Sequence, residues 1–114
     1  MHELGIVFHL RDLLEDVAGE QGLTHIVKVS VNLGEVSGVM TDLFEEAWRW
    51  TADKTDLLRG SELDITCIEA VTACNDCGKT YRTVEHGRTC PHCSSPHTEL
   101  LRGKELEVRE IEAY

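Results

Sequence analysis

The chain has 114 residues, and its 21 acidic and 11 basic side chains give a formal net charge of −10. Hydrophobic residues make up 41% and charged residues 28%, which is typical of a folded globular protein and excludes a disordered one. A general nucleic-acid-binding protein needs a basic surface, so the charge argues against that class. No apolar run approaches the roughly 20 residues that span a bilayer, and the first residues lack the basic start of a signal peptide. We therefore expect a cytoplasmic protein with no membrane or nucleic-acid partner.

The charge is distributed unevenly along the chain. Residues 1–73 carry 14 acids and 5 bases, residues 74–98 carry 2 acids and 3 bases, and residues 99–114 carry 5 acids and 3 bases. The middle block also holds four of the five cysteines and both prolines. This shift in composition predicts two domains. One is formed by 1–73 plus 99–114, and the other, 74–98, is inserted into it.

The first half of the chain predicts a helix followed by a strand. Apolar residues between 4 and 17 recur mostly at spacings of three and four, which is typical of a helix with one buried face. Gly19 and Gly22 offer places for this helix to end. From Ile26 to Leu33 apolar and polar residues alternate, which predicts a half-buried strand.

The second half predicts another helix and two more strands. Asp42, with Glu45 three residues later, is typical of a capping box and predicts a helix that ends before Gly60. Alternation predicts a strand over 63–71 that runs into the cysteine block, and another over 105–109. Because these two strands flank the insertion, we expect them to pair. The predicted fold is α+β, with two helices on a three-stranded antiparallel-type sheet and an inserted four-cysteine, zinc-ribbon-like domain.

Two Cys-x-x-Cys turns, separated by 12 residues, form the strongest motif of the sequence. Each turn directs two sulfurs at one point, so Cys74, Cys77, Cys90 and Cys93 together offer four thiolates to one ion. Zn²⁺ prefers four such ligands, and a closed site of this kind is structural. Iron in a rubredoxin-like site remains an alternative. Disulfides are disfavoured by the odd number of cysteines and the absence of an export signal.

Other residues near this block have less specific roles. Cys67 lies on the predicted strand with Leu63 and Ile65, so we expect it to be a small core residue and not a metal ligand. Three histidines, His86, His92 and His97, lie within or beside the second turn. They are either exposed loop residues or groups whose titration alters the zinc site.

The first three residues offer a second metal-binding set. Met1 contributes an α-amine in a chain that begins there, His2 an amide nitrogen and an imidazole, and Glu3 a carboxylate. The three nitrogens can form adjacent chelate rings, an arrangement that favours square-planar Ni(II) or Cu(II). The alternative is an exposed histidine followed by an acid that is favourable at a helix start.

Four features of this sequence occur together in one known family. They are the opening Met1–Glu3 before an amphipathic helix, Leu33-Gly34-Glu35 at the end of a strand, a helix containing Leu43-Phe44, and the inserted pair of Cys-x-x-Cys turns. In length, motif order and spacing the chain resembles the HypA/HybF family of nickel metallochaperones for hydrogenase maturation. The resemblance covers nearly the whole chain.

The resemblance implies an N-terminal nickel-binding domain in which His2 is the indispensable ligand, with the N-terminal nitrogens and Glu3 beside it. It implies structural zinc on the four cysteines of the inserted domain. Some members place an acid near the nickel after the Gly-Glu turn, where this chain has Met40, with Asp42 nearby. The implied partners are a maturation GTPase of the HypB type, the hydrogenase large subunit and, for some members, urease accessory proteins.

Two tryptophans and two rival functions complete the sequence-based expectations. Trp48 and Trp50 lie two residues apart on a predicted helix, so they do not face the same side. Either one is buried and the other is a partner anchor, or both are shielded.

A zinc-ribbon adaptor for protein or nucleic acid, without nickel transfer, is the alternative function. The sequence has none of the common catalytic motifs, so we do not expect an enzyme.

Overall fold

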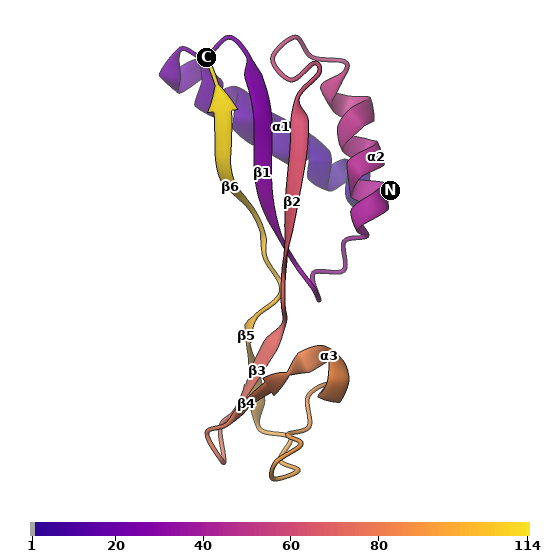
Figure 1. Ribbon diagram of the computed structural model, residues 1–114, viewed down its shortest axis with the longest axis vertical. Helices are drawn as coiled ribbons and strands as arrows, with labels where there is room; N and C mark the ends of the chain where they lie inside the picture. Colours follow the sequence, from indigo (N-terminus) through magenta and orange to yellow (C-terminus); the bar gives the residue numbers. More distant parts are fainter. Residues whose placement is uncertain (1) are drawn as a thin grey trace. The chain divides into compact units, whose positions relative to one another are not determined.

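The computed structural model describes residues 2–114, except for the side chain of His2. Over these residues it contains α1 (His2–Gln21), β1 (Ile26–Gly34), α2 (Thr41–Ala52), β2 (Glu62–Ile68), β3 (Val71–Cys74), β4 (Thr80–Arg82), α3 (Thr83–His86), β5 (Thr98–Arg102) and β6 (Leu106–Ala113) (Figure 1). Among the described residues, no helix is both long enough and apolar enough to cross a lipid bilayer. The elements form two units. The first contains the segment that ends at Val31 together with Val39–Ile65 and Val108–Tyr114, and the second contains Asn32–Gly38 and Thr66–Glu107.

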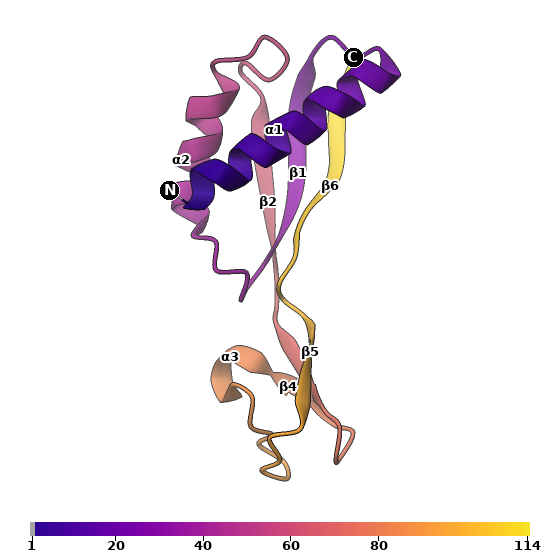
Figure 2. The same ribbon diagram turned by 180° about the vertical axis from the view of Figure 1, so that it is seen from behind.

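The core of the first unit lies between the two long helices and the sheet. Helix α1 crosses one face of the sheet, and α2 packs against α1 (Figure 2). Buried apolar residues on the helices follow the predicted spacing: Val7, Leu10, Leu14 and Ala18 on α1; Phe44, Ala47, Trp48 and Ala52 on α2. On β1, Val29 and Val31 are buried as the alternation predicts, whereas Val27 is 44% exposed and Ile26 and Ser30 are buried. The predicted first helix is confirmed and is longer than expected, since it begins at His2 and ends at Gln21. Gly22, with φ of +68°, follows its end.

The first sheet has the strand order β2-β1-β6, so β1 is central. The Ile26 amide donates to the Leu57 carbonyl (2.8 Å), and the Glu35 amide donates to the Ile68 carbonyl (2.8 Å). Residue numbers rise together in these two pairs, so β1 and β2 run in the same direction. The antiparallel pairing expected throughout the sheet is therefore wrong here. The reason is that α2 connects β1 to β2 and acts as a crossover, which returns the chain parallel to its previous strand.

Strand β6 occupies the other edge of β1 and runs in the opposite direction. The Gly34 amide donates to the Glu105 carbonyl (2.7 Å), and the Tyr114 amide donates to the His25 carbonyl (2.9 Å). The expectation that the two strands flanking the insertion pair with each other is wrong for β2 and β6, because β1 lies between them. The α+β class is confirmed, and the sheet is mixed.

The second unit has its own sheet, with the order β4-β3-β5 and antiparallel pairing throughout. Thr72 on β3 lies opposite Tyr81 on β4 and opposite Leu100 on β5. The single strand predicted over 63–71 is in fact two strands, β2 and β3, that belong to different sheets. Glu69 interrupts the alternation of Leu63, Ile65 and Cys67 just where β2 ends, before β3 begins at Val71. The expected domain boundaries at 74 and 98 stay a prediction.

The start of α2 differs from the predicted capping box. The helix begins at Thr41, its N-cap residue is Met40, and no side chain of the described residues caps it through a hydrogen bond. Asp42 lies in the first turn, where its negative charge is favourable beside the helix dipole. The stabilisation at this end is therefore electrostatic and does not come from a side-chain cap.

Two glycines permit a close approach of chain segments in the second unit. The Val36 amide donates to the Gly103 carbonyl (2.8 Å). A Cβ on Gly34 would overlap that carbonyl and would lie 2.6 Å from the Glu105 nitrogen. Gly103 has φ of +121°, and a Cβ there would lie 2.6 Å from the Ala70 Cα. The glycine of the Leu33-Gly34-Glu35 motif is therefore required by backbone packing.

Replacing Gly34 with alanine should lower the free energy of unfolding of the metal-loaded protein by at least ~2 kcal/mol, because the clashing atoms are backbone and cannot rotate away. Gly19→Ala is the matched control. A Cβ at Gly19 meets nothing within 4 Å on α1, so this change should stabilise the protein by about 0.5–1 kcal/mol. Urea unfolding of both variants measures the difference. Equal stability of Gly34→Ala and the unmodified protein would contradict the packing argument.

Candidate metal centre

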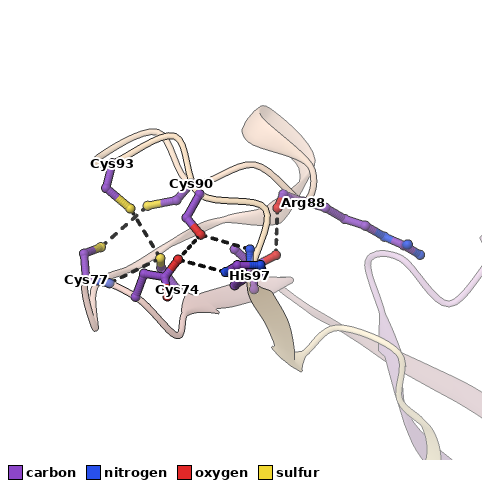
Figure 3. A network of polar contacts seen from close by, with 9 residues as sticks. Cys74, Cys77, Arg88, Cys90, Cys93 and His97 are labelled. Atoms are coloured by element: carbon purple, nitrogen blue, oxygen red, sulfur yellow. Dashed lines mark hydrogen bonds and ion pairs between the residues drawn. The ribbon is translucent and has the colours of Figure 1, made fainter.

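The four cysteines of the two Cys-x-x-Cys turns converge on one point (Figure 3). Their sulfurs all lie within 4.8 Å of one another, with 3.5 Å between Cys74 Sγ and Cys93 Sγ and 3.7 Å between Cys77 Sγ and Cys90 Sγ. Four sulfurs at about 2.3 Å from a tetrahedral Zn²⁺ are about 3.8 Å apart, whereas disulfide sulfurs are about 2.05 Å apart. All four are free thiols. The donor set and its spacing fit a four-coordinate metal ion.

The two turns hold their sulfurs with equivalent backbone contacts. The Cys77 amide points at Cys74 Sγ, and the His92 amide points at Cys90 Sγ, each at 3.4 Å. Both turns close with an amide-to-carbonyl bond, from Gly78 to Cys74 (3.0 Å) and from Ser94 to Cys90 (2.8 Å). Amides directed at sulfur favour the thiolate over the thiol. The backbone therefore prepares the sulfurs to act as anionic ligands.

The thiols differ in how readily they ionise. The Cys77 amide lowers the pKa of Cys74 to about 7. The Ser95 amide lowers the pKa of Cys93. Three effects outweigh it and raise this pKa to about 12: the thiol of Cys74, burial, and the thiols of Cys90 and Cys77. For Cys77, the Lys79 amide and the Cys93 thiol lower the pKa, but burial and the thiols of Cys74 and Cys90 outweigh them and raise it. Negative charges this close repel each other, so a cation is needed to ionise all four thiols together.

Few apolar side chains support the cysteine-containing segment 74–98. Tyr81 packs with Cys74 and Cys90 in a small buried cluster, and its hydroxyl donates to the Gly87 carbonyl (2.9 Å). Val84, the other sizeable apolar residue of this segment, is 59% exposed. A cluster of one tyrosine and two cysteines buries too little surface to offset chain entropy. The bound metal must therefore provide much of the folding free energy here.

A polar network links the two cysteine turns. The Asp76 carboxylate, between Cys74 and Cys77, accepts a hydrogen bond from the Ser95 hydroxyl and lies 3.0 Å from His97 Nδ1 (Figure 3). The His97 amide donates to Ser95 Oγ (3.0 Å). The Ser95 hydroxyl, and then His97, lower the pKa of Asp76, so its anion is held firmly. The sequence analysis missed this network, because the partners are about 20 residues apart and have no diagnostic spacing.

The remaining residues near the cysteine turns have different surroundings. His86, His92 and His97 are all exposed, as one of the two interpretations expected. The His86 ring contacts the edge of Tyr81, with 5.9 Å between ring centroids.

The expectation that Cys67 is a core residue is wrong, because its side chain is exposed. Strand β2 is an edge strand with a neighbour on one side only, so alternation along it does not ensure burial.

The predicted N-terminal set is described only in part. Met1 and the side chain of His2 lie outside the described residues. Glu3 is buried in the first turn of α1, with 5% of its surface exposed, and its Oε2 accepts a bond from the Met40 amide (3.4 Å). Met40, which the resemblance aligns with an acid of some members, is 57% exposed. Asp42 is exposed. The fold thus brings Glu3 to the backbone that precedes α2.

Comparison with known proteins places the chain in a family. A family model described as "Hydrogenase/urease nickel incorporation, metallochaperone, hypA" matches residues 1–113. The chain belongs to the HypA family. It is 33% identical to the hydrogenase maturation factor HypA of Aquifex aeolicus over 98% of this chain and 96% of that protein. It is 34% identical to HypA of Shewanella sp. strain MR-7, over 98% and 94% of the two chains.

Solved structures of HypA proteins share the fold. The solution structure of the Ni metallochaperone HypA from Helicobacter pylori matches 97% of this chain and 96% of its own, with a TM-score of 0.73 and 24% identity. A second structure, described as the solution structure of HypA protein, matches 100% and 97% with a TM-score of 0.75 and 25% identity. The α+β fold is therefore shared with these HypA structures.

Metal loading of the cysteine site should release protons. Cys93, with a pKa of about 12, and Cys77, with a raised pKa, are thiols at pH 7.5, and metal binding converts them to thiolates. Titrating metal-free protein with Zn(II) should release at least about two protons per ion, and affinity should fall as the pH falls because protons compete with the metal. Calorimetry in buffers of different ionisation enthalpy measures the number. Release of less than one proton would contradict ligation by these thiols.

The Asp76 network should support metal retention. Asp76→Ala removes the carboxylate that joins the two cysteine turns, so we expect metal affinity to fall on the order of tenfold. Glu99→Ala, which removes an exposed acid on β5, is the control and should leave affinity unchanged. Competition with a chromophoric chelator measures both. Loss of affinity in the control, or none in Asp76→Ala, would contradict a specific role for the network.

Proposed function

We propose that this chain is a cytoplasmic nickel metallochaperone that binds Ni(II) at its N-terminus and delivers it during maturation of [NiFe]-hydrogenase, and of urease where that enzyme is the client. The family match over residues 1–113, together with the opening Met1-His2-Glu3, carries the proposal. The protein acts as a carrier and not as an enzyme: it transfers an ion and changes no covalent bond.

Nickel is the cargo of the N-terminal tripeptide. In a chain that begins at Met1, the α-amine, the His2 amide nitrogen and the His2 imidazole supply three nitrogen donors in adjacent chelate rings. Deprotonation of the amide favours Ni(II) over Zn(II), because Zn(II) prefers tetrahedral coordination. A carrier needs moderate affinity, and a micromolar dissociation constant corresponds to about 8 kcal/mol.

Glu3 supports the same site from the first turn of α1. Its Oε2 is held by the Met40 amide, so the carboxylate has a fixed position beside the start of the helix. Its other oxygen, Oε1, is the one that would reach the metal or stabilise the positive charge of the complex. A buried carboxylate with one neutral hydrogen-bond donor is costly in isolation, and a nearby cation offsets that cost.

The four-cysteine site holds Zn(II) permanently as a structural ion. Four thiolates leave no open coordination position, so the site has no place for a substrate or an incoming ligand. The two sites thus differ in purpose. The closed site of Cys74, Cys77, Cys90 and Cys93 maintains the second unit, and the terminal site exchanges its metal.

Delivery requires partners that accept or supply nickel. The proposed partners are a GTPase of the HypB type, the hydrogenase large subunit and, for urease, its accessory proteins. Ligands at a chain terminus can be replaced one at a time by those of a partner, which avoids releasing the free ion. The exchange therefore needs contact between the partner and the surface around the start of α1.

Replacing His2 with alanine should abolish nickel binding, from about one ion per chain to none, because it removes the imidazole that closes the chelate. His9→Ala is the matched control, since His9 is an exposed histidine on the same helix. Equilibrium dialysis with Ni(II), using protein with its native N-terminus, gives the stoichiometry. Metal analysis should give one zinc per chain for both variants. Stoichiometric nickel in His2→Ala would contradict the proposal.

A further inference from the structure

An apolar hollow of about 410 Å³ lies between α1 and α2 in the first unit. It is lined by Leu4 from α1 and by Leu43, Glu46, Ala47 and Trp50 from α2. Leu4 and Leu43 are partly exposed, and the Trp50 side chain is 53% exposed. The hollow begins one residue after Glu3, so it adjoins the start of α1.

Helix α2 carries two apolar stripes, and only one of them faces the core. Phe44 and Trp48 are buried at 0% and 1% exposure, which confirms the expectation that one tryptophan belongs to the core. Leu43 and Trp50 lie seven residues apart, two turns along the same side of the helix, and line the hollow together with Ala47, which is itself buried in the core. An exposed tryptophan beside partly exposed leucines is typical of a protein-binding surface.

The two sides of Trp50 differ in their surroundings. On one side it lines a separate groove, where Lys54 Nζ lies 4.4 Å from the centre of the indole ring and the Phe8 ring lies 6.4 Å away. On the other side it lines the hollow, where Glu46 is the only charged residue among the lining residues that the structure describes. The groove side of Trp50 therefore already contacts a cation, and the hollow side offers an aromatic wall beside a carboxylate.

The chemistry of the hollow selects a basic side chain. Asp42, Glu45 and Glu46 are acidic, and α2 has no base before Arg49. An arginine or lysine that enters the hollow gains an ion pair with Glu46 and a cation–π contact with Trp50. Its aliphatic stem covers the leucines of the hollow. The net charge of −10 favours the approach of a basic partner.

We infer that this hollow docks a basic segment of the nickel-exchanging partner protein, with one arginine or lysine side chain between Trp50 and Glu46. That the docked segment belongs to a protein that exchanges nickel with this chain rests on the proposed function. The location explains the coupling of docking to transfer: a segment bound beside Leu4 brings the partner's own metal ligands next to Met1–Glu3. Docking energy is then used to place two sets of ligands together.

The test uses the full-length protein with its native N-terminus. The probes are the purified maturation GTPase and the hydrogenase large-subunit precursor of the same organism. Trp50→Ala and Glu46→Lys should each raise the dissociation constant for one of these probes at least tenfold, as expected for an anchor residue. Glu20→Lys makes the same charge change at an exposed site on α1 outside the hollow, and should leave affinity within about twofold. Calorimetric titration gives the constants.

Each outcome separates docking from nickel binding. The inference is supported if both hollow variants keep their nickel stoichiometry and thermal stability. It is also supported if replacing a basic residue of the partner with glutamate restores binding to Glu46→Lys. The inference is overturned if the unmodified protein binds neither probe, or if the hollow variants bind the probe as tightly as the unmodified protein. Loss of nickel in both variants also overturns it. So does sedimentation showing that the hollow is covered by a second copy of this chain.

The inference and the proposed function fail in different ways. If His2→Ala loses nickel yet still binds the probe through Trp50 and Glu46, both hold. If the unmodified protein binds no nickel but the hollow variants lose the probe, the proposed function fails and the docking surface stands. If nickel binding follows His2 and the hollow variants bind the probe normally, the docking inference fails alone.

Discussion

The convergence of four thiols on a space only a few ångströms wide is the constraint on which the second unit depends. The strands that bring them there are short, and Tyr81 is the single large side chain in the buried cluster beside them. Although the amides of Lys79 and Ser95 lower them, the pKa values of Cys77 and Cys93 are raised by neighbouring thiols and by burial. A cation would stabilise the four thiolates together, which couples metal binding to the folding of this segment.

The backbone around the site is arranged to hold a fixed shape. Amides in both turns point at sulfur, and the Asp76 carboxylate joins one turn to Ser95 and His97 after the other. These contacts surround the ligands and orient them. Such rigidity suits an ion that stays. An ion that must leave needs ligands at an accessible place, and the proposed function assigns that role to the opening tripeptide.

The first unit joins the starts of its two long helices and leaves part of α2 exposed. Glu3 is buried and tied to the Met40 amide, which fixes the start of α1 to the start of α2. Between these two helices Trp50 is exposed, while Trp48, two residues before it, is fully covered. One short helix therefore contributes to the core through Phe44 and Trp48 and to the protein surface through Trp50.

The sequence by itself determined the local features, because their residues are close along the chain. The spacing of Cys74, Cys77, Cys90 and Cys93 predicted one four-sulfur site, and periods of 3.6 and 2 predicted α1, α2, β1 and β6. Tertiary structure alone decided what depends on distant segments. It placed β1 between β2 and β6, left Cys67 exposed on an edge strand, and joined Asp76 to His97. It also required Gly34 to lack a side chain, because the Gly103 backbone occupies that space. Periodicity fixes which face of an element is apolar, but only packing decides which neighbour covers that face.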